Sequence, residues 1–243
     1  MTDTIEIKGL CKTFHVEGRA VEVLKNLDLQ VPAHEITVLL GRSGCGKTTL
    51  LRLIGGLEQP DSGTIRRPPD SKTAFVFQEA RLMPWLSVQK NIAFGLKKKD
   101  VRRSELEHLI AMTGLQGFED ALPGQLSGGM QQRCALARAL ALKPDFILMD
   151  EPFAALDHFT REKMQNFLLE LHQQSRCGVL FVTHSIDEAL TIADRIVILD
   201  DHSVKKGYPI GSAWRARATA EDRHALRQAI LSSIETTKNE KET

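Results

Sequence analysis

In 35-EITVLLGRSGCGKTTLLRLIGGL-57, an apolar strand leads into a glycine-rich loop, and the loop leads into a helix. Residues 35–40 are mostly apolar and rich in β-branched side chains, which is typical of a buried strand. The apolar side chains of 48–57 recur at helical spacing, and Gly55-Gly56 is expected to end the helix. Strand, loop and helix in this order predict the first unit of a parallel α/β sheet.

The loop of this unit, 41-GRSGCGKT-48, matches the whole pattern G-x-x-x-x-G-K-[ST]. Its glycines allow backbone N–H groups to face phosphate oxygens, and the next helix presents its positive end to the same anion. Lys47 is long enough to reach the β- and γ-phosphates, and the Thr48 hydroxyl suits Mg²⁺. The loop alone does not distinguish a kinase, a GTPase and an ATPase. The predicted nucleotide-binding residues are Gly41, Arg42, Ser43, Gly44, Cys45, Gly46, Lys47, Thr48 and Thr49.

The second half of the chain alternates between predicted strands and helices. Buried strands are expected at 146–150, 179–183 and 196–199, and helices at 160–174 and 186–193 lie between them. Fully apolar strands separated by amphipathic helices indicate a parallel sheet that is covered on both faces.

Two other regions depart from this alternation. Near the N-terminus, 4–10 alternates as a half-buried strand does, and 21–31 is also strand-like. From about 82 to 138 the strand signals fade, so this segment is predicted to be a helical insertion. Within it, Ser104 and Glu107 have the spacing of a capping box at a helix start.

Length and composition limit the class of protein. The 243 residues allow one large domain or two modest ones. A single domain is expected at 1–234, and the polar residues 235–243 are expected to be a disordered tail. With 32 Lys+Arg and 31 Asp+Glu, the net charge of +1 argues against nucleic acid as a partner. No apolar run approaches the roughly 18 residues of a membrane span, and the start of the chain lacks the pattern of a signal peptide. Four cysteines without CxxC spacing are interpreted as structural thiols in a reducing cytoplasm.

Two carboxylates, Asp150 and Glu151, stand at the end of the apolar strand 146–149. Asp150 is placed to hold Mg²⁺, and Glu151 to act as the general base that polarises an attacking water. The alternative is an ordinary solvated junction between a strand and a loop. The phosphate-binding loop in the same chain favours the metal and base roles.

A second helix start with accessible backbone N–H groups lies at 126-LSGGM-130. Ser127 suits the N-cap, and Gly128 and Gly129 leave the N–H groups unobstructed, so this turn is predicted to be a second anion site. Two chains that meet head to tail would each cover the nucleotide of the other.

The chain resembles the nucleotide-binding subunit of an ABC transporter in four motifs, which are 41-GRSGCGKTT-49, 126-LSGGM-130, 146-FILMDEP-152 and 182-VTH-184 in this order. The resemblance covers roughly residues 4–200. It implies the α/β fold of a P-loop NTPase of the ABC ATPase type, with a mainly parallel central sheet, an N-terminal antiparallel β part and a helical subdomain insertion. It also implies that two copies of the chain bind ATP and Mg²⁺ between them and hydrolyse the ATP.

The resemblance further implies roles outside the phosphate loop. Phe14 corresponds to the aromatic residue that stacks on adenine, Gln78 to the glutamine that contacts Mg²⁺ or water, and His184 to the histidine at the γ-phosphate. Asp157 ends the loop that joins the two active sites. The alternatives are a core aromatic for Phe14 and polar strand ends for Gln78 and His184. The implied catalytic residues are Lys47, Gln78, Glu151 and His184, and the implied Mg²⁺ ligands are Thr48, Gln78 and Asp150.

The stretch 77-FQEARLMPWLSVQKNIAFGL-96 resembles importer ATPases for nitrate, sulfonate and taurine. Leu82–Trp85 form an apolar cluster that suits docking of a short helix from a membrane partner, although a patch inside the helical subdomain is the alternative. The implied partners are a second copy of the chain, membrane permease subunits that dock near Gln78–Trp85, and indirectly a solute-binding protein. The implied location is the cytoplasmic face of the membrane.

Three other functions remain open from the sequence. One is a soluble ABC-type ATPase that is not coupled to transport, although the long insertions or paired cassettes of such proteins do not fit this chain. Another is a P-loop kinase, which leaves Ser127–Met130 unexplained. The last is an ATP-gated dimerisation module that does not hydrolyse ATP.

Overall fold

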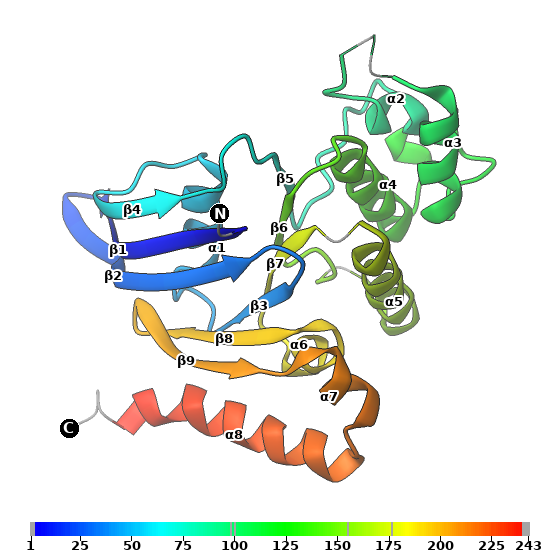
Figure 1. Ribbon diagram of the computed structural model, residues 1–243. Helices are drawn as coiled ribbons and strands as arrows, with labels where there is room; N and C mark the ends of the chain where they lie inside the picture. Colours follow the sequence, from blue (N-terminus) through cyan, green and yellow to red (C-terminus); the bar gives the residue numbers. More distant parts are fainter. Residues whose placement is uncertain (1–2, 98, 100, 155, 176, 240–243) are drawn as a thin grey trace.

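Two β-sheets pack against each other in the computed structural model, which describes residues 3–97, 99, 101–154, 156–175 and 177–239 (Figure 1). The smaller sheet is antiparallel and has the order β2-β1-β4, with β1 Thr4–Val16, β2 Arg19–Pro32 and β4 Ser62–Arg66. The larger sheet has the order β5-β6-β7-β3-β8-β9, with β3 Ile36–Leu40, β5 Thr73–Val76, β6 Phe146–Asp150, β7 Gly178–Thr183, β8 Arg195–Asp200 and β9 Ser203–Pro209.

Helices connect and cover these strands. Their bounds are α1 Lys47–Gly55, α2 Val88–Ile92, α3 Arg103–Met112, the 3₁₀ turn η2 Pro123–Gln125, α4 Gly128–Ala141, α5 His158–Ser175, α6 Ile186–Ile192, α7 Gly211–Arg217 and α8 Ala220–Asn239. In Figure 1, α2, α3 and α4 stand together at one end of the larger sheet, as the predicted helical insertion requires.

The larger sheet is parallel from β5 to β8, and β9 pairs antiparallel with β8. Its central strands are buried on both faces. On one face, side chains such as Leu39 pack with α1 and the antiparallel sheet. On the other face, side chains such as Val38 pack with α4, α5, α6 and α8. The predicted parallel sheet with two covered faces and the predicted antiparallel part at the N-terminus are both confirmed.

The carboxyl ends of β3, β6 and β7 lie at the same edge of the sheet. The strand register pairs Leu40 with Thr183 and Asp150 with Val182. The segments that leave these three strands therefore start side by side. They are the glycine-rich loop after β3, Glu151 after β6 and His184 after β7, so residues more than a hundred positions apart reach one place.

The predicted capping box at the start of α3 is wrong. The helix begins one residue before Ser104, and Arg102 is its extended N-cap residue without a side-chain cap bond. Glu107 pairs instead with Arg103, at 2.8 Å between Nε and Oε1. The carboxylate that a capping box requires is thus used by an i,i+4 ion pair on the surface of the helix.

The residues after β8 form β9, α7 and α8, which pack on the sheet. The Tyr208 hydroxyl lies 3.0 Å from the carbonyl of Ala229 and 2.8 Å from the hydroxyl of Ser233, so hydrogen bonds join β9 to α8. Helix α8 continues to Asn239, within the segment 235–243 for which a disordered tail was expected, and residues 240–243 lie outside the described residues. None of the helices in the described part of the chain is both long and apolar enough to cross a bilayer.

Candidate nucleotide-binding site

The glycine-rich loop after β3 turns sharply before α1 begins at Lys47. Gly46 has φ +101°, and a Cβ there would lie 2.7 Å from the carbonyl oxygen of Val23 on β2. A Cβ on Gly41 would overlap the carbonyl oxygen of Leu199. Both positions therefore require glycine, and the loop is packed tightly between β2 and β8.

The ammonium of Lys47 lies inside this loop. Its Nζ donates to the carbonyls of Gly41 at 2.8 Å and Arg42 at 2.7 Å, and the residue is 5% exposed. The thiol of Cys45 lies 3.8 Å away, and burial raises its pKa. The tip residues Arg42, Ser43 and Gly44 are exposed, while Thr48 and Thr49 are half-buried in the first turn of α1. The loop thus surrounds a positive charge and opens toward solvent at its tip.

Two of the expected Mg²⁺ ligands are in direct contact. The Thr48 hydroxyl donates to Asp150 Oδ1 at 3.0 Å. Burial raises the pKa of Asp150, and the nearby charge of Glu151 acts in the same direction. A partly buried carboxylate beside a hydroxyl fits a hard divalent cation, because oxygen ligands suit it and its charge offsets the cost of burial. Gln78, the third expected ligand, is exposed directly after β5 and Phe77.

Glu151 and His184 also meet. Glu151 adopts φ +43°, and its N–H donates to the carbonyl of Val182 at 3.0 Å. This unusual conformation turns the side chain so that Oε2 lies 2.9 Å from Nδ1 of His184. A pocket of about 60 Å³ lies beside the pair, with room for water. A carboxylate, an imidazole and space for water are the groups that general-base hydrolysis requires.

The Ser-Gly-Gly turn has the predicted helix cap. Ser127 accepts a hydrogen bond from the N–H of Met130 at 3.3 Å and is the N-cap of α4. Ser127 and Gly128 are exposed, and Gly129 is half-buried against Thr160 at the start of α5. The turn is therefore accessible to an anion supplied from outside the chain.

Comparison with known proteins decides the family. Residues 24–154 match the family model described as ABC transporter. The aliphatic sulfonates import ATP-binding protein SsuB of Bacillus subtilis is 42% identical over an alignment of 248 positions, which covers 98% of this chain and 96% of the relative. An uncharacterised ABC transporter ATP-binding protein of Methanocaldococcus jannaschii is 47% identical over 205 residues, which cover 80% of this chain and 77% of the relative.

The chain belongs to the ABC transporter family. It is an ATPase subunit of this family, as predicted. Among solved structures, the dimeric structure of the bacterial ABC transporter cassette MJ0796 matches with a TM-score of 0.75 and 33% identity, covering 84% of this chain and 98% of that chain. A post-hydrolysis dimer of the same cassette, bound to ADP and Pi, matches with a TM-score of 0.74.

Two expected ATP-contacting residues of this ABC cassette lie outside the sheet edge described above. Phe14 is half-buried on β1, opposite Val21 of β2, and the ammonium of Lys12 lies 5.0 Å from its ring centroid. Asp157 is exposed before α5, where its carboxylate accepts from the N–H of Thr160. Hydrogen bonding from the side chain of Thr160, and then from its N–H, lowers the pKa of Asp157. Their roles toward ATP stay predictions.

Sequence reasoning missed a buried polar link beside the Glu151–His184 pair. The Thr183 hydroxyl donates to Glu188 of α6 at 2.5 Å, and the other oxygen of Glu188 lies 3.4 Å from Arg161 of α5. The guanidinium of Arg161 donates in turn to the carbonyl of Leu156 at 2.8 Å. The link ties the residue before His184 to the loop that carries Asp157. No residue pattern marks it, because its partners are a backbone carbonyl and side chains on three separate elements.

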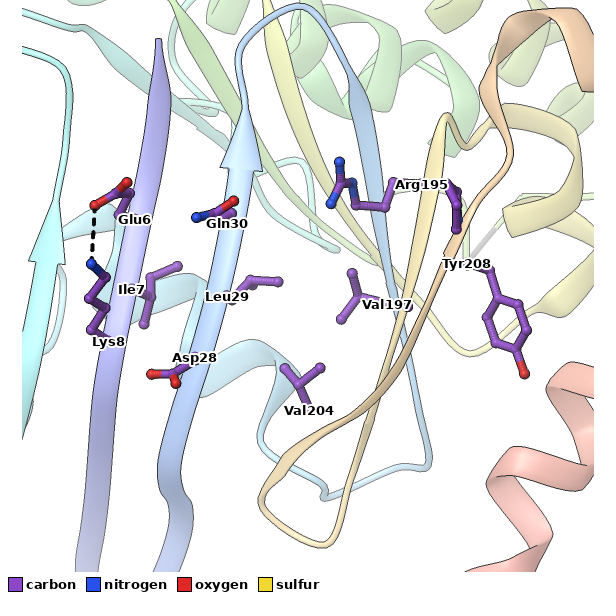
Figure 2. A pocket seen from close by; sticks show the side chains of 12 residues that line it. Glu6, Ile7, Lys8, Asp28, Leu29, Gln30, Arg195, Val197, Val204 and Tyr208 are labelled. Atoms are coloured by element: carbon purple, nitrogen blue, oxygen red, sulfur yellow. Dashed lines mark ion pairs between the residues drawn. The ribbon is translucent and has the colours of Figure 1, made fainter. Parts of the chain in front are cut away.

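A groove on another side of the cassette lies between β1 and β2 on one wall and β8 and β9 on the other (Figure 2). Its volume is about 730 Å³, and Val197 and Val204 face it. The ion pair between Glu6 and Lys8 lies at its rim, while Tyr208 points toward α8. None of the residues predicted to contact ATP lines it.

Replacing Asp150 by Asn is expected to raise the melting temperature of the nucleotide-free cassette by roughly 2–4 °C. The variant removes a charge that burial disfavours, yet it keeps an oxygen that accepts from Thr48. The pKa of Asp150 in the folded chain lies above its ordinary value of 3.8. At pH values above this raised pKa, the ionised carboxylate lowers the free energy of unfolding. Below pH 3.8 the group is protonated in both states, so this destabilisation is absent. Thermal unfolding measures this, and the difference from wild type should shrink in acidic buffer. An equal or lower melting temperature at neutral pH would contradict the assigned burial cost.

Proposed function

We propose that this ABC ATPase powers the import of a small solute, with an aliphatic sulfonate as the first candidate. The observation that carries this proposal is the match to the sulfonate importer subunit over nearly the whole of both chains, which includes the region of β9, α7 and α8. Relatives with the same printed function in Pseudomonas savastanoi and Pseudomonas syringae share 47% and 48% identity over 191 residues.

In the proposed reaction, the loop 41–49 holds the phosphates of ATP, and Phe14 stacks on the adenine. Lys47 moves from the carbonyls of Gly41 and Arg42 to phosphate oxygens, so its charge stabilises the transferred group. Thr48, Asp150 and Gln78 would hold Mg²⁺, which offsets phosphate charge when bound. These side chains thus orient the γ-phosphate toward the sheet edge from which Glu151 and His184 extend.

Glu151 is the proposed base for the water that attacks the γ-phosphate. Its carboxylate takes the proton of the water as the new oxygen–phosphorus bond forms and the bond between the γ-phosphorus and the β–γ bridging oxygen breaks. His184 holds this carboxylate through Nδ1 at 2.9 Å, and its other ring nitrogen would contact the γ-phosphate. The products are ADP and inorganic phosphate, and the proton leaves through Glu151.

A second copy of the chain is the proposed source of the remaining contacts. Ser127, Gly128 and Gly129 of each copy would bind the γ-phosphate held by the loop of the other copy, and Asp157 would lie near the junction. Accessibility of the Ser-Gly-Gly turn supports this arrangement, and the matched cassette is dimeric. Because these contacts exist only when the two copies close, ATP binding would favour the closed dimer and its hydrolysis the open one.

The proposed docking site for the permease is the segment Gln78–Trp85, at the cytoplasmic face of the membrane. Trp85 is 72% exposed, which is unusual for so large an apolar side chain. The fully buried Asn91 fixes its loop, because its amide oxygen accepts from Met83 N and its amide nitrogen donates to the carbonyls of Met83, Leu86 and Ser87. A rigid loop with an exposed aromatic residue suits an anchor in a partner groove. A solute-binding protein would act on the other side of the permease.

Growth and uptake in cells test the import function. In the organism that carries this chain, deletion should abolish growth on an aliphatic sulfonate as sole sulfur source, and wild-type protein should restore it. Trp85→Ser should fail to restore growth although the purified variant hydrolyses ATP normally, whereas Leu57→Ser, which changes another exposed apolar residue, should succeed. If deletion abolished the uptake of nitrate alone, nitrate would replace the sulfonate as the proposed solute. Normal uptake of every tested solute in the deletion strain would contradict the import function.

A further inference from the structure

The side chain of Gln132 joins segments that are far apart in the sequence. It lies on α4, five residues after Ser127, and the residue is only 4% exposed. Its Nε2 donates to the carbonyls of Phe77 at 3.0 Å, Gln78 at 3.3 Å and Pro152 at 2.7 Å. The amide group has two hydrogens, so one of them is shared between two carbonyls. A single buried group therefore contacts both the segment of Gln78 and the residue after Glu151.

A second side chain of α4 holds the same segment at its other end. Arg138 donates to the carbonyls of Ala80 at 2.9 Å and Arg81 at 2.8 Å. The segment also folds on itself, because the guanidinium of Arg81 lies 4.0 Å from the ring centroid of Phe77. Gln132 thus binds one end of residues 77–81 to α4, and Arg138 binds the other end. A displacement of α4 is therefore expected to displace these residues as well.

Helix α4 begins at the turn that, in the proposed function, binds the nucleotide of the second copy. A helix is stiff along its axis, so a shift of its first turn also displaces Gln132 within the next turn. All three hydrogen-bond acceptors of Gln132 belong to segments with a proposed part in hydrolysis. A residue that only stabilised the helical part would contact that part, as Gln131 does through the carbonyls of Pro123 and Leu126.

We propose that Gln132 is a positioning residue that transmits the engagement of Ser127–Gly129 by the partner's nucleotide to Gln78 and Glu151. The proposal rests on the roles given above to Ser127–Gly129, Gln78 and Glu151. In this role Gln132 acts through the backbone carbonyls to which it donates. It sets the position of Gln78 relative to Thr48 and Asp150, and the path of the backbone after Glu151.

The first test is Gln132→Met, which keeps length and volume but removes the donor. The kcat for ATP should fall about tenfold, because hydrolytic groups lose their alignment. The KM for ATP should stay within about twofold, since the loop 41–49 is unchanged. The Mg²⁺ concentration for half-maximal activity should rise several-fold, and amides of 77–81 should exchange faster with deuterium.

The matched control is Thr113→Val. Thr113 is 2% exposed and donates to the carbonyl of Leu109, so the control also loses a buried hydrogen bond in the helical part without loss of volume. It should lower the melting temperature and leave kcat and the Mg²⁺ requirement unchanged. A fall in kcat equal to that of Gln132→Met would show a general effect of destabilisation and overturn the proposal.

A double-mutant cycle tests the transmission itself. Ser127→Ala and Gln132→Met should together reduce kcat clearly less than the product of their separate effects, because they interrupt one path. Fully multiplicative effects would overturn the proposal, and so would a folded Gln132→Met with wild-type kcat and Mg²⁺ requirement. If that variant does not fold, Gln132→Asn, which keeps the amide but shortens its reach, must lower kcat in the same way. If Ser127→Ala alone has no effect, the proposed role of the Ser-Gly-Gly turn fails instead.

Discussion

Replacement of Glu151 by Gln is expected to reduce ATP hydrolysis by about 100-fold or more while ATP binding persists. The amide has the same shape as the carboxylate and can keep a contact with Nδ1 of His184, so the local structure should survive. It does not accept a proton from water, however, and the step that needs a base is lost. Because binding without hydrolysis holds the closed state, the variant should accumulate as an ATP-bound dimer.

Steady-state phosphate release and light scattering after gel filtration with Mg·ATP measure these effects. Glu162→Gln, in the second turn of α5, is a suitable control, because it removes an exposed carboxylate that does not line the pocket beside Glu151 and His184. It should hydrolyse ATP at the wild-type rate and show no trapped dimer. Near-normal turnover in Glu151→Gln would rule out Glu151 as the base.

Replacement of Lys47 by Ala is expected to weaken ATP binding by roughly 10- to 100-fold. This is the effect expected from the loss of one to two charged hydrogen bonds to phosphate. The buried ammonium is held by the carbonyls of Gly41 and Arg42, so its charge is already in the loop when the nucleotide arrives. Alanine supplies no donor and leaves these two carbonyls without their partner. Hydrolysis should fall with binding.

Titration with a fluorescent ATP analogue measures this affinity, and thermal unfolding checks that the variant folds. Lys25→Ala is the control, because its ammonium is well exposed and pairs with Glu22 on the antiparallel sheet. It should bind ATP as the wild type does. Unchanged affinity in Lys47→Ala would contradict the role assigned to the loop.

The parts of the fold that have a local pattern were predictable. The strand expected at 146–150 is β6 with the same bounds, and the helix expected after the glycine-rich loop ends at Gly55. β9 was missed because its sequence, 203-SVKKGYP-209, has the lysines and glycine of an edge strand and lacks an apolar alternation. Its pairing with β8 depends on the turn at Asp201 and His202, both of which have positive φ. Asp and His adopt positive φ more readily than most residues, but the pair does not mark a hairpin as Asn-Gly or Asp-Gly does.

The candidate site was predictable as a set of residues, but its contacts were not. Motif spacing placed Asp150 and His184 at strand ends, and the register of β3, β6 and β7 then brings these ends together. The contact between Thr48 and Asp150 spans 102 positions, and no local pattern specifies it. Gln132 was missed because its partners are backbone carbonyls, which are the same for every residue type.

The contact between Gly46 and β2 has a consequence for which molecules fit the cassette. Val23 and Leu24 touch the phosphate loop at Gly46, and Val21 on the same strand pairs with Phe14. Extended strand rises about 3.3 Å per residue, so β2 fixes the separation between the Phe14 ring and the phosphate-binding loop. In the proposed binding mode, with adenine on Phe14 and the phosphates in the loop, this fixed separation would select ligands by their length. Pyrophosphate or a free nucleoside would then contact only one of the two places.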